Sequence, residues 1–95
     1  MPSETLLLHF AEDEASATRI AQAANMAMAR IERHRFPDGE LKLRLPPQLP
    51  PHVVLLRTLD HPNEKLVELL LVARTARQLG ATHLPLVAPY LAYMR

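Results

Sequence analysis

The sequence predicts an α/β sandwich with a mainly parallel sheet. Short runs of apolar, strand-type residues recur along the 95-residue chain. Two longer stretches between these runs place apolar residues at helical spacing. One segment rich in turn residues has strand-type flanks on both sides, which indicates a single hairpin. Strands that alternate with helices favour parallel pairing, because each helix can serve as the crossover connection.

The first strand and helix are predicted in residues 5–28. Residues 5–10 are mostly apolar and predict a short buried strand. An acidic cluster, residues 12–14, follows, and negative charge is favoured at the positive end of a helix dipole. We therefore expect a helix over about residues 14–28. Its apolar stripe comprises Ala17, Ile20, Ala21, Ala24, Met28 and Ile31. The stripe is mostly alanine, so it can approach a sheet closely while burying little area per residue.

The hairpin is predicted around residues 36–40, Phe-Pro-Asp-Gly-Glu. Proline fixes one φ angle, aspartate can bond its own backbone, and glycine can take a positive φ. Residues 31–36 alternate weakly and predict an extended edge segment. Residues 41–45 alternate leucine with Lys42 and Arg44, which predicts a half-buried strand with one wet face.

The second half of the chain predicts a strand, a helix and a last strand. A rigid connector with four prolines spans residues 46–51 and leads to a buried strand at 53–57. The helix is expected over about 62–79, with Gly80 in a left-handed position after its end. Its front cap is left open among Asp60, His61 and Asn63. The expected apolar face comprises Leu66, Leu69, Leu70, Ala73 and Ala76. The final strand is predicted at residues 83–88.

Composition narrows the possible functions. Hydrophobic residues make up 48% of the chain, charged residues 22%, and the net charge is +1. Such a charge gives no overall field for nucleic acid or an acidic membrane, so neither is expected as a partner. The absence of cysteine excludes disulfides and thiolate metal sites, and it fits a reducing cytosol. No membrane-spanning segment or signal peptide is expected.

The turn segment carries the first candidate chemistry. Phe36 beside Asp38 and Glu40 can hold a purine: the ring stacks on the base, and a carboxylate accepts from the exocyclic amine. A plain hairpin turn, with a buried phenylalanine and solvated acids, is the simpler interpretation and is favoured by these residues alone.

Arg95 is the second candidate, because it follows the last strand, where open α/β sheets present ligand sites. Its planar fork of donors can grip phosphate, whereas a solvated surface arginine is the simpler alternative. Tyr90 and Tyr93 can line a pocket or belong to the core.

The remaining charged residues give weaker signals. No two of the five histidines share a helical spacing, so no metal cluster is predicted. The Arg33-His34-Arg35 segment can attract an anion, although a solvated charged edge is favoured. Glu68 is expected on the wet face of its helix.

Three segments resemble one family in order and spacing. They are residues 35–40 (Arg-Phe-Pro-Asp-Gly-Glu), 62–71 (Pro-Asn-Glu-Lys-Leu-Val-Glu-Leu-Leu-Leu) and 89–95 (Pro-Tyr-Leu-Ala-Tyr-Met-Arg). Together they resemble the amino-terminal domain of ribose-phosphate pyrophosphokinase, also called phosphoribosyl-pyrophosphate synthetase. The resemblance covers nearly the whole chain. It reverses the preference for the simpler interpretations of Phe36, Asp38, Glu40 and Arg95.

The resemblance implies a phosphoribosyltransferase type I-like sandwich with helices on both faces. It implies a cytoplasmic, homo-oligomeric transferase of nucleotide biosynthesis, which moves the β,γ-diphosphoryl group of ATP to the 1-hydroxyl of ribose 5-phosphate with Mg²⁺. In this family the residue matching Phe36 stacks on adenine, and those matching Asp38 and Glu40 hydrogen-bond the nucleotide from a neighbouring subunit. The residue matching Arg95 contacts ATP from the subunit's own side.

The chain also departs from the family pattern. Leu91, Ala92 and Met94 stand where the family usually has Phe, Gly and Ala, and Ala92 changes how closely the backbone can approach a ligand. Residues 1–95 are expected to be an amino-terminal half domain, truncated before the catalytic half and inactive alone, with no catalytic residue of its own. One alternative is a non-catalytic paralogue or half domain that regulates a true synthetase. Another is a nucleotide-binding module unrelated to diphosphoryl transfer.

Overall fold

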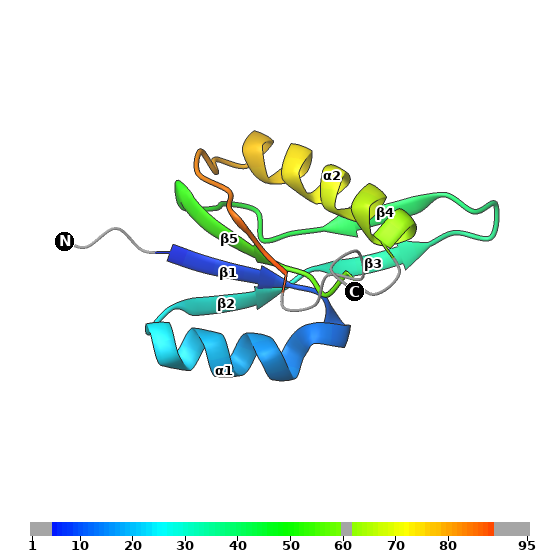
Figure 1. Cartoon of the computed structure of the whole chain (residues 1–95). Helices are drawn as coiled ribbons and strands as arrows, with labels where there is room; N and C mark the ends of the chain where they lie inside the picture. The colour runs from blue at the N-terminus through cyan, green and yellow to red at the C-terminus, as the bar shows by residue number, and fades with distance from the viewer. Residues whose placement is uncertain (1–4, 60–61, 89–95) are drawn as a thin grey trace.

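The parallel sheet and its two covering helices form the body of the molecule. The computed structural model describes residues 5–59 and 62–88. Its main sheet contains β1 (Thr5–His9), β2 (Ala27–Arg30), β5 (His52–Leu56) and β6 (Leu86–Val87) in the order β2-β1-β5-β6. Every pair in it is parallel. Figure 1 shows α1 (Glu14–Ala24) on one face of this sheet and α2 (Pro62–Gln78) on the other. The predicted α/β sandwich is confirmed.

Strand β1 lies at the centre of the core. Leu7 and Leu8 are both fully buried, and they belong to different apolar clusters. Leu7 packs with Ala17 and Ala21 of α1, whereas Leu8 belongs to the larger cluster that includes Val72 of α2. A parallel strand with a helix on each face has no solvent-facing side, so its leucines run without polar alternation.

The first helix ends earlier than the sequence predicts. It stops at Ala24, and Asn25 takes the left-handed conformation with φ 57° and ψ 48°. Asparagine is one of the few residues that visit this region. Residues 27–30 then form β2, in register with residues 6–9 of β1. Met28 is therefore a strand residue and Ile31 follows the strand, because pairing along β1 outweighs the helix propensity of the alanine-rich segment.

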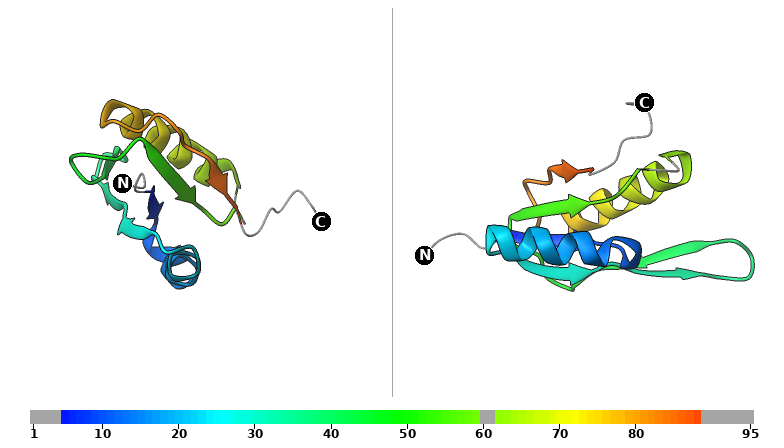
Figure 2. Two further views of the ribbon diagram at one scale, coloured as in Figure 1. Left: turned by 90° about the vertical axis from the view of Figure 1, so that its left-hand side faces the viewer. Right: turned by 60° about the horizontal axis from the view of Figure 1, so that its bottom comes forward.

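A separate antiparallel hairpin extends from the body. It consists of β3 (Glu32–Arg35) and β4 (Leu41–Arg44), as the sequence predicts. Ile31 is buried at the junction, and its backbone N–H donates to the carbonyl oxygen of His9 at 2.7 Å. The chain thus leaves the parallel sheet where β1 ends. The views in Figures 1 and 2 agree that the tip of the hairpin projects beyond the two helices.

Helix α2 matches the predicted span but buries a different face. Its buried residues include Glu68, Leu69, Val72 and Ala76. Leu70, expected in the core, is 72% exposed, and Leu66 is 38% exposed. A charged side chain therefore takes part of the inward face. Along the described residues, no helix is long and apolar enough to cross a membrane.

The last strand is shorter than predicted, because only Leu86–Val87 is regular strand. An isolated parallel bridge joins His83 to His52 further back along the chain. Pro85 lies between the bridge and the strand. Its carbonyl accepts a hydrogen bond from Leu55 N–H at 2.9 Å, but proline has no backbone N–H to donate to β5, so the regular strand begins after it.

Gly80 ends α2 with φ +122°, as expected of a residue after a helix. A Cβ added to it would lie 2.8 Å from the carbonyl oxygen of Leu49. The proline connector, residues 46–51, lies against this end of the helix. Its Leu49 N–H donates to the Leu79 carbonyl at 3.1 Å.

We predict that Gly80→Ala destabilises the fold more than Gly39→Ala. Both glycines have positive φ, but a Cβ at Gly39 would meet nothing within 4 Å. Backbone strain of about 1–3 kcal/mol is common to both, and only Gly80→Ala adds a clash with backbone. Urea unfolding of the two variants measures the difference, and equal losses of stability would contradict this account.

Candidate functional site

The tip of the hairpin brings together Phe36, Asp38 and Glu40. Phe36 N–H donates to the Glu40 carbonyl at 2.8 Å, and Gly39 N–H donates to the Phe36 carbonyl at 2.9 Å. The Asp38 carboxylate accepts from Glu40 N–H at 3.0 Å. This last bond is the one by which aspartate stabilises a turn. The turn therefore has a defined backbone that fixes the spacing of the three side chains.

All three side chains at the tip are exposed. Phe36 is 37% exposed, so it is not the buried ring of a plain hairpin turn. The His34 ring packs edge-on against it, with ring centroids 4.4 Å apart and an interplanar angle of 71°. An aromatic ring that is partly exposed and held by a second ring is suited to stacking on a planar ligand.

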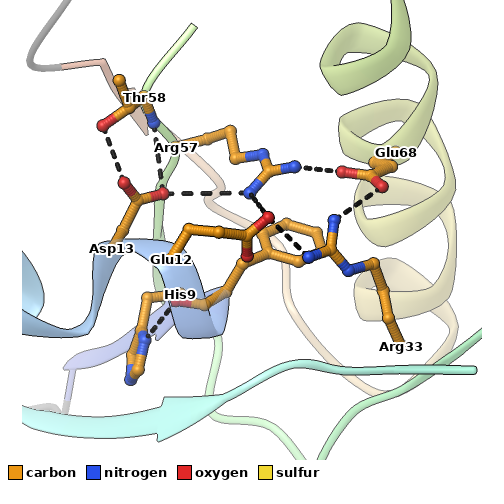
Figure 3. A network of polar contacts seen from close by, with 8 residues as sticks. His9, Glu12, Asp13, Arg33, Arg57, Thr58 and Glu68 are labelled. Atoms are coloured by element: carbon orange, nitrogen blue, oxygen red, sulfur yellow. Dashed lines mark hydrogen bonds and ion pairs between the residues drawn. The ribbon is translucent and has the colours of Figure 1, made fainter. Parts of the chain in front are cut away.

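A second group of polar residues lies at the base of the hairpin, where β1 and β5 end (Figure 3). We call it the charged cluster, and it comprises Glu12, Asp13, Arg33, Arg57 and Glu68. Its members come from η1 (Ala11–Asp13) after β1, from β3, from the residue after β5, and from α2. The carboxyl ends of parallel strands meet at one edge, where α/β sheets present ligand sites.

Arg57 is the buried centre of the cluster, with its side chain only 1% exposed. Its Nη2 donates to the carboxylate of Glu68. Its Nη1 lies 3.6 Å from Glu12 Oε2 and 3.9 Å from Asp13 Oδ2, which are charge contacts rather than hydrogen bonds. The guanidinium also stacks on the Phe10 ring, 4.0 Å from its centroid. Asp13 is itself held by the Thr58 hydroxyl, which donates to Oδ1 at 2.7 Å.

Arg33 joins the hairpin to this buried centre. Its Nη1 donates to Glu68 Oε2 at 2.8 Å, and its Nη2 donates to Glu12 Oε2 at 2.5 Å. Its guanidinium carbon lies 5.1 Å from the centroid of the Phe10 ring. Glu68 thus binds one arginine with each carboxylate oxygen, and both arginines lie against Phe10. The arrangement can hold the hairpin at a fixed angle to the sheet.

The cluster shifts the pKa values of two members. Partial burial alone would raise the pKa of Glu12, but the hydrogen bond from Arg33, a backbone hydrogen bond and the two arginine charges together hold it below its usual value. Burial alone would lower the pKa of Arg33, but its bonds to Glu12 and Glu68 raise it. Both groups are therefore charged at neutral pH.

The structure corrects the sequence-based prediction for Glu68. It was expected on a wet helix face but is 6% exposed and bound to two arginines. Arg33 lies on an exposed strand, as expected, and its guanidinium also binds two carboxylates. One signal for the cluster was present: Arg57 directly follows an apolar buried strand, and an arginine there needs a carboxylate partner.

Other candidates are not located. Arg95, Tyr90 and Tyr93 lie outside the described residues, so the structure does not relate them to the hairpin tip. Within residues 5–59 and 62–88, no group of three or more His, Cys, Asp or Glu side chains could hold a metal ion.

Comparison with known proteins gives a consistent result. The family model for the N-terminal domain of ribose phosphate pyrophosphokinase matches residues 5–95. The chain is 40% identical over 78 residues to a ribose-phosphate pyrophosphokinase of Saccharolobus solfataricus, covering 80% of this chain and 27% of that protein. It is 37% identical over 78 residues to a ribose-phosphate pyrophosphokinase of Methanopyrus kandleri, and this match covers 81% of this chain and 27% of that protein. The chain therefore spans about a quarter of the length of these relatives.

We predict that Glu68→Gln lowers the free energy of unfolding by about 3 kcal/mol, because it leaves the buried charge of Arg57 without its closest partner. Glu32→Gln is the matched control, since Glu32 is 67% exposed and lies 3.8 Å from Arg44. An exposed pair of that kind contributes less than about 1 kcal/mol. Urea unfolding at neutral pH measures both, and similar losses for the two variants would refute the proposed role of Glu68.

The lowered pKa of Glu12 predicts a loss of stability in acid. A carboxylate with a lower pKa in the folded state stabilises the fold above its unfolded pKa, which is about 4.3. That contribution disappears as the pH falls through the lower folded pKa. We therefore expect Glu12→Gln to flatten the fall in unfolding free energy as the pH drops below about 5. Glu32→Gln again serves as control, and an unchanged slope in Glu12→Gln would argue against the Arg33 contact.

Proposed function

The chain belongs to the family of amino-terminal domains of ribose-phosphate pyrophosphokinase, and from this membership we propose that it carries part of an ATP site. The proposed reaction converts ATP and ribose 5-phosphate to AMP and 5-phosphoribosyl 1-diphosphate. The sugar 1-hydroxyl oxygen bonds to the β-phosphorus of ATP, loses its proton, and AMP leaves with the bridging oxygen. The proposed setting is a cytoplasmic homo-oligomer. The single observation that carries the proposal is the exposed group of Phe36, Asp38 and Glu40 on one ordered turn.

The turn residues have distinct roles in this proposal. Phe36 stacks on adenine, and stacking of a base on an aromatic side chain contributes about 1–3 kcal/mol. A carboxylate of Asp38 or Glu40 accepts a hydrogen bond from the exocyclic amine, which distinguishes adenine from a base that presents a carbonyl there. These groups bind and orient the nucleotide. They do not touch the phosphates that react, so this part of the chain contributes position rather than chemistry.

Magnesium does not fit the described residues. They offer no cluster of carboxylates or histidines for a divalent ion. In the proposed enzyme, Mg²⁺ is carried by the ATP phosphates and by parts of the protein beyond the described residues. We also propose that residues 1–95 alone are inactive, because they match only about a quarter of the length of the related enzymes.

The position of the hairpin supports a site shared between subunits. Every residue from Glu32 to Glu40 is exposed, and the tip projects away from the two helices (Figure 2). Leu70 of α2 and Leu86 of β6 are also exposed, at 72% and 45%. Leu70 belongs to a run of exposed apolar residues on α2, with Leu66, Val67 and Leu71. Contiguous exposed apolar surface is typical of association sites. We propose that Phe36 reaches the nucleotide of a neighbouring subunit and that Arg95 contacts ATP within its own subunit.

We predict that Phe36→Ala in the complete protein weakens ATP binding by roughly tenfold or more, as the loss of base stacking requires. Isothermal titration calorimetry gives the Kd for ATP. Lys42→Gln is the matched control, because Lys42 is exposed on the same hairpin and has no proposed contact with the nucleotide. Equal affinity of Phe36→Ala and the parent protein would eliminate the proposed stacking role.

A mixing experiment tests the shared site. Phe36→Ala and Arg95→Ala each damage one side of it, so oligomers of either variant alone are expected to form little AMP. Oligomers reassembled from both should regain part of the activity, since some sites then combine an intact Phe36 with an intact Arg95. No recovery, with reassembly verified by sedimentation, would place both residues in one subunit. A protein that binds ATP but never forms AMP would instead favour the regulatory paralogue.

A further inference from the structure

The hairpin is attached to the body by contacts of two kinds. Leu43 and Leu45 of the β4 side pack on the larger apolar cluster. Arg33 on the β3 side forms the ionic contacts with Glu12 and Glu68. A hollow of about 680 Å³ opens alongside the hairpin; its lining includes Arg33 and Leu45 at the base, Phe36 near the tip, and Leu79 after the end of α2. Among the described residues, the turn at 37–39 forms no ionic or apolar contact with the body. The hairpin is therefore fixed mainly near its base.

The two kinds of contact differ in what they fix. Apolar burial is non-directional, so Leu43 and Leu45 keep the hairpin close to the body without setting its angle. The planar guanidinium of Arg33 presents its donors as a rigid fork. Its two arms are bound by carboxylates from different elements, η1 and α2. Rotation of the hairpin about its base would break at least one of these bonds.

The length of the hairpin amplifies any such rotation. Strands advance by roughly 3.3 Å per residue, so Asp38 lies on the order of 15 Å along the strand from Arg33. A tilt of about 10° at the base then moves the tip by about 2–3 Å. Binding groups have to stay within about 0.5 Å of a productive position. A small change of angle at Arg33 thus becomes a displacement of several ångströms at the tip, where Phe36 lies.

We propose that Arg33 is a positioning residue for the nucleotide: its two-armed contact with Glu12 and Glu68 sets the angle at which the hairpin presents Phe36, Asp38 and Glu40. This inference rests on the proposed function of the hairpin tip. It assigns to the charged cluster a role in ligand affinity as well as in folding, exerted through the angle of the hairpin and not through a proposed contact with the ligand.

Kinetics of the complete protein test the effect on the nucleotide. Arg33→Gln is expected to raise KM for ATP by about tenfold and to leave KM for ribose 5-phosphate unchanged, because only the adenine contacts shift. Arg33→Lys keeps the charge but not the fork, so it should restore only part of the affinity. Arg44→Gln is the matched control, since Arg44 forms an exposed pair on the same hairpin, with 81% of its side chain accessible. Equal KM values for ATP in the parent protein and Arg33→Gln would overturn the proposal.

A distance measurement tests the position of the hairpin without ATP. The 95 residues contain no cysteine, so spin labels can be placed at Gln22→Cys on α1 and Lys42→Cys on β4, both exposed positions. Arg33→Gln is expected to broaden the label distance distribution by several ångströms, and Arg44→Gln to leave it narrow. Glu12→Gln removes one arm and keeps the buried Arg57–Glu68 pair, so it should broaden the distribution less and should still fold.

The two measurements separate this inference from the proposed function. If the parent protein fails to bind ATP, the proposed function fails and the role in affinity fails with it, whatever the label distances show. If the parent protein binds ATP but Arg33→Gln changes neither the distances nor KM for ATP, only the positioning role is overturned. A broadened distance distribution and a raised KM for ATP in Arg33→Gln would support both the proposed function and the positioning role of Arg33.

Discussion

The buried charge of Arg57 is the constraint on which the rest of this structure depends. An arginine at the end of an apolar strand is stable only with a carboxylate beside it, and Glu68 supplies that carboxylate from α2. This requirement sets the rotation of α2 about its axis: Glu68 turns inward, and Leu70 is left in solvent. With Glu68 turned inward, its second carboxylate oxygen accepts a hydrogen bond from Arg33. One strand-end residue thereby connects the packing of a helix to the attachment of the hairpin.

Local signals were sufficient to predict most elements of the fold. Short apolar runs predict β1 and β5, the Asp-Gly turn predicts the hairpin, and Gly80 predicts the end of α2; the structure confirms each. The errors arise where distant residues decide the outcome. Met28 pairs in a strand because β1 offers it an edge, although the local sequence favours helix. Leu70 is exposed because a carboxylate two residues earlier is required inside.

The candidate site was predictable at its tip but not at its base. Phe36, Asp38 and Glu40 are close in sequence and share one turn, so their proximity follows from local chemistry. Arg33, Glu12 and Glu68 are separated by 21 and 35 residues and meet only after the sheet has formed. Charged side chains are usually solvated, and a single sequence gives no reason to place these three together. Figure 3 shows why the folded structure is needed: the ends of β1 and β5 lie next to α2, and this arrangement brings the three side chains together.

The alanine-rich contact of α1 has a thermal consequence. Ala17 and Ala21 bury little surface against the sheet, whereas the opposite face carries the larger apolar cluster and Glu68 with the two arginines that it binds. The ion pair that α1 forms, between Glu14 and Arg30, is exposed. Charged groups lose favourable hydration on warming, so an ion-pair network keeps its strength at temperatures where apolar contacts gain nothing more. We therefore expect heating to loosen α1 from the sheet before it separates the base of the hairpin.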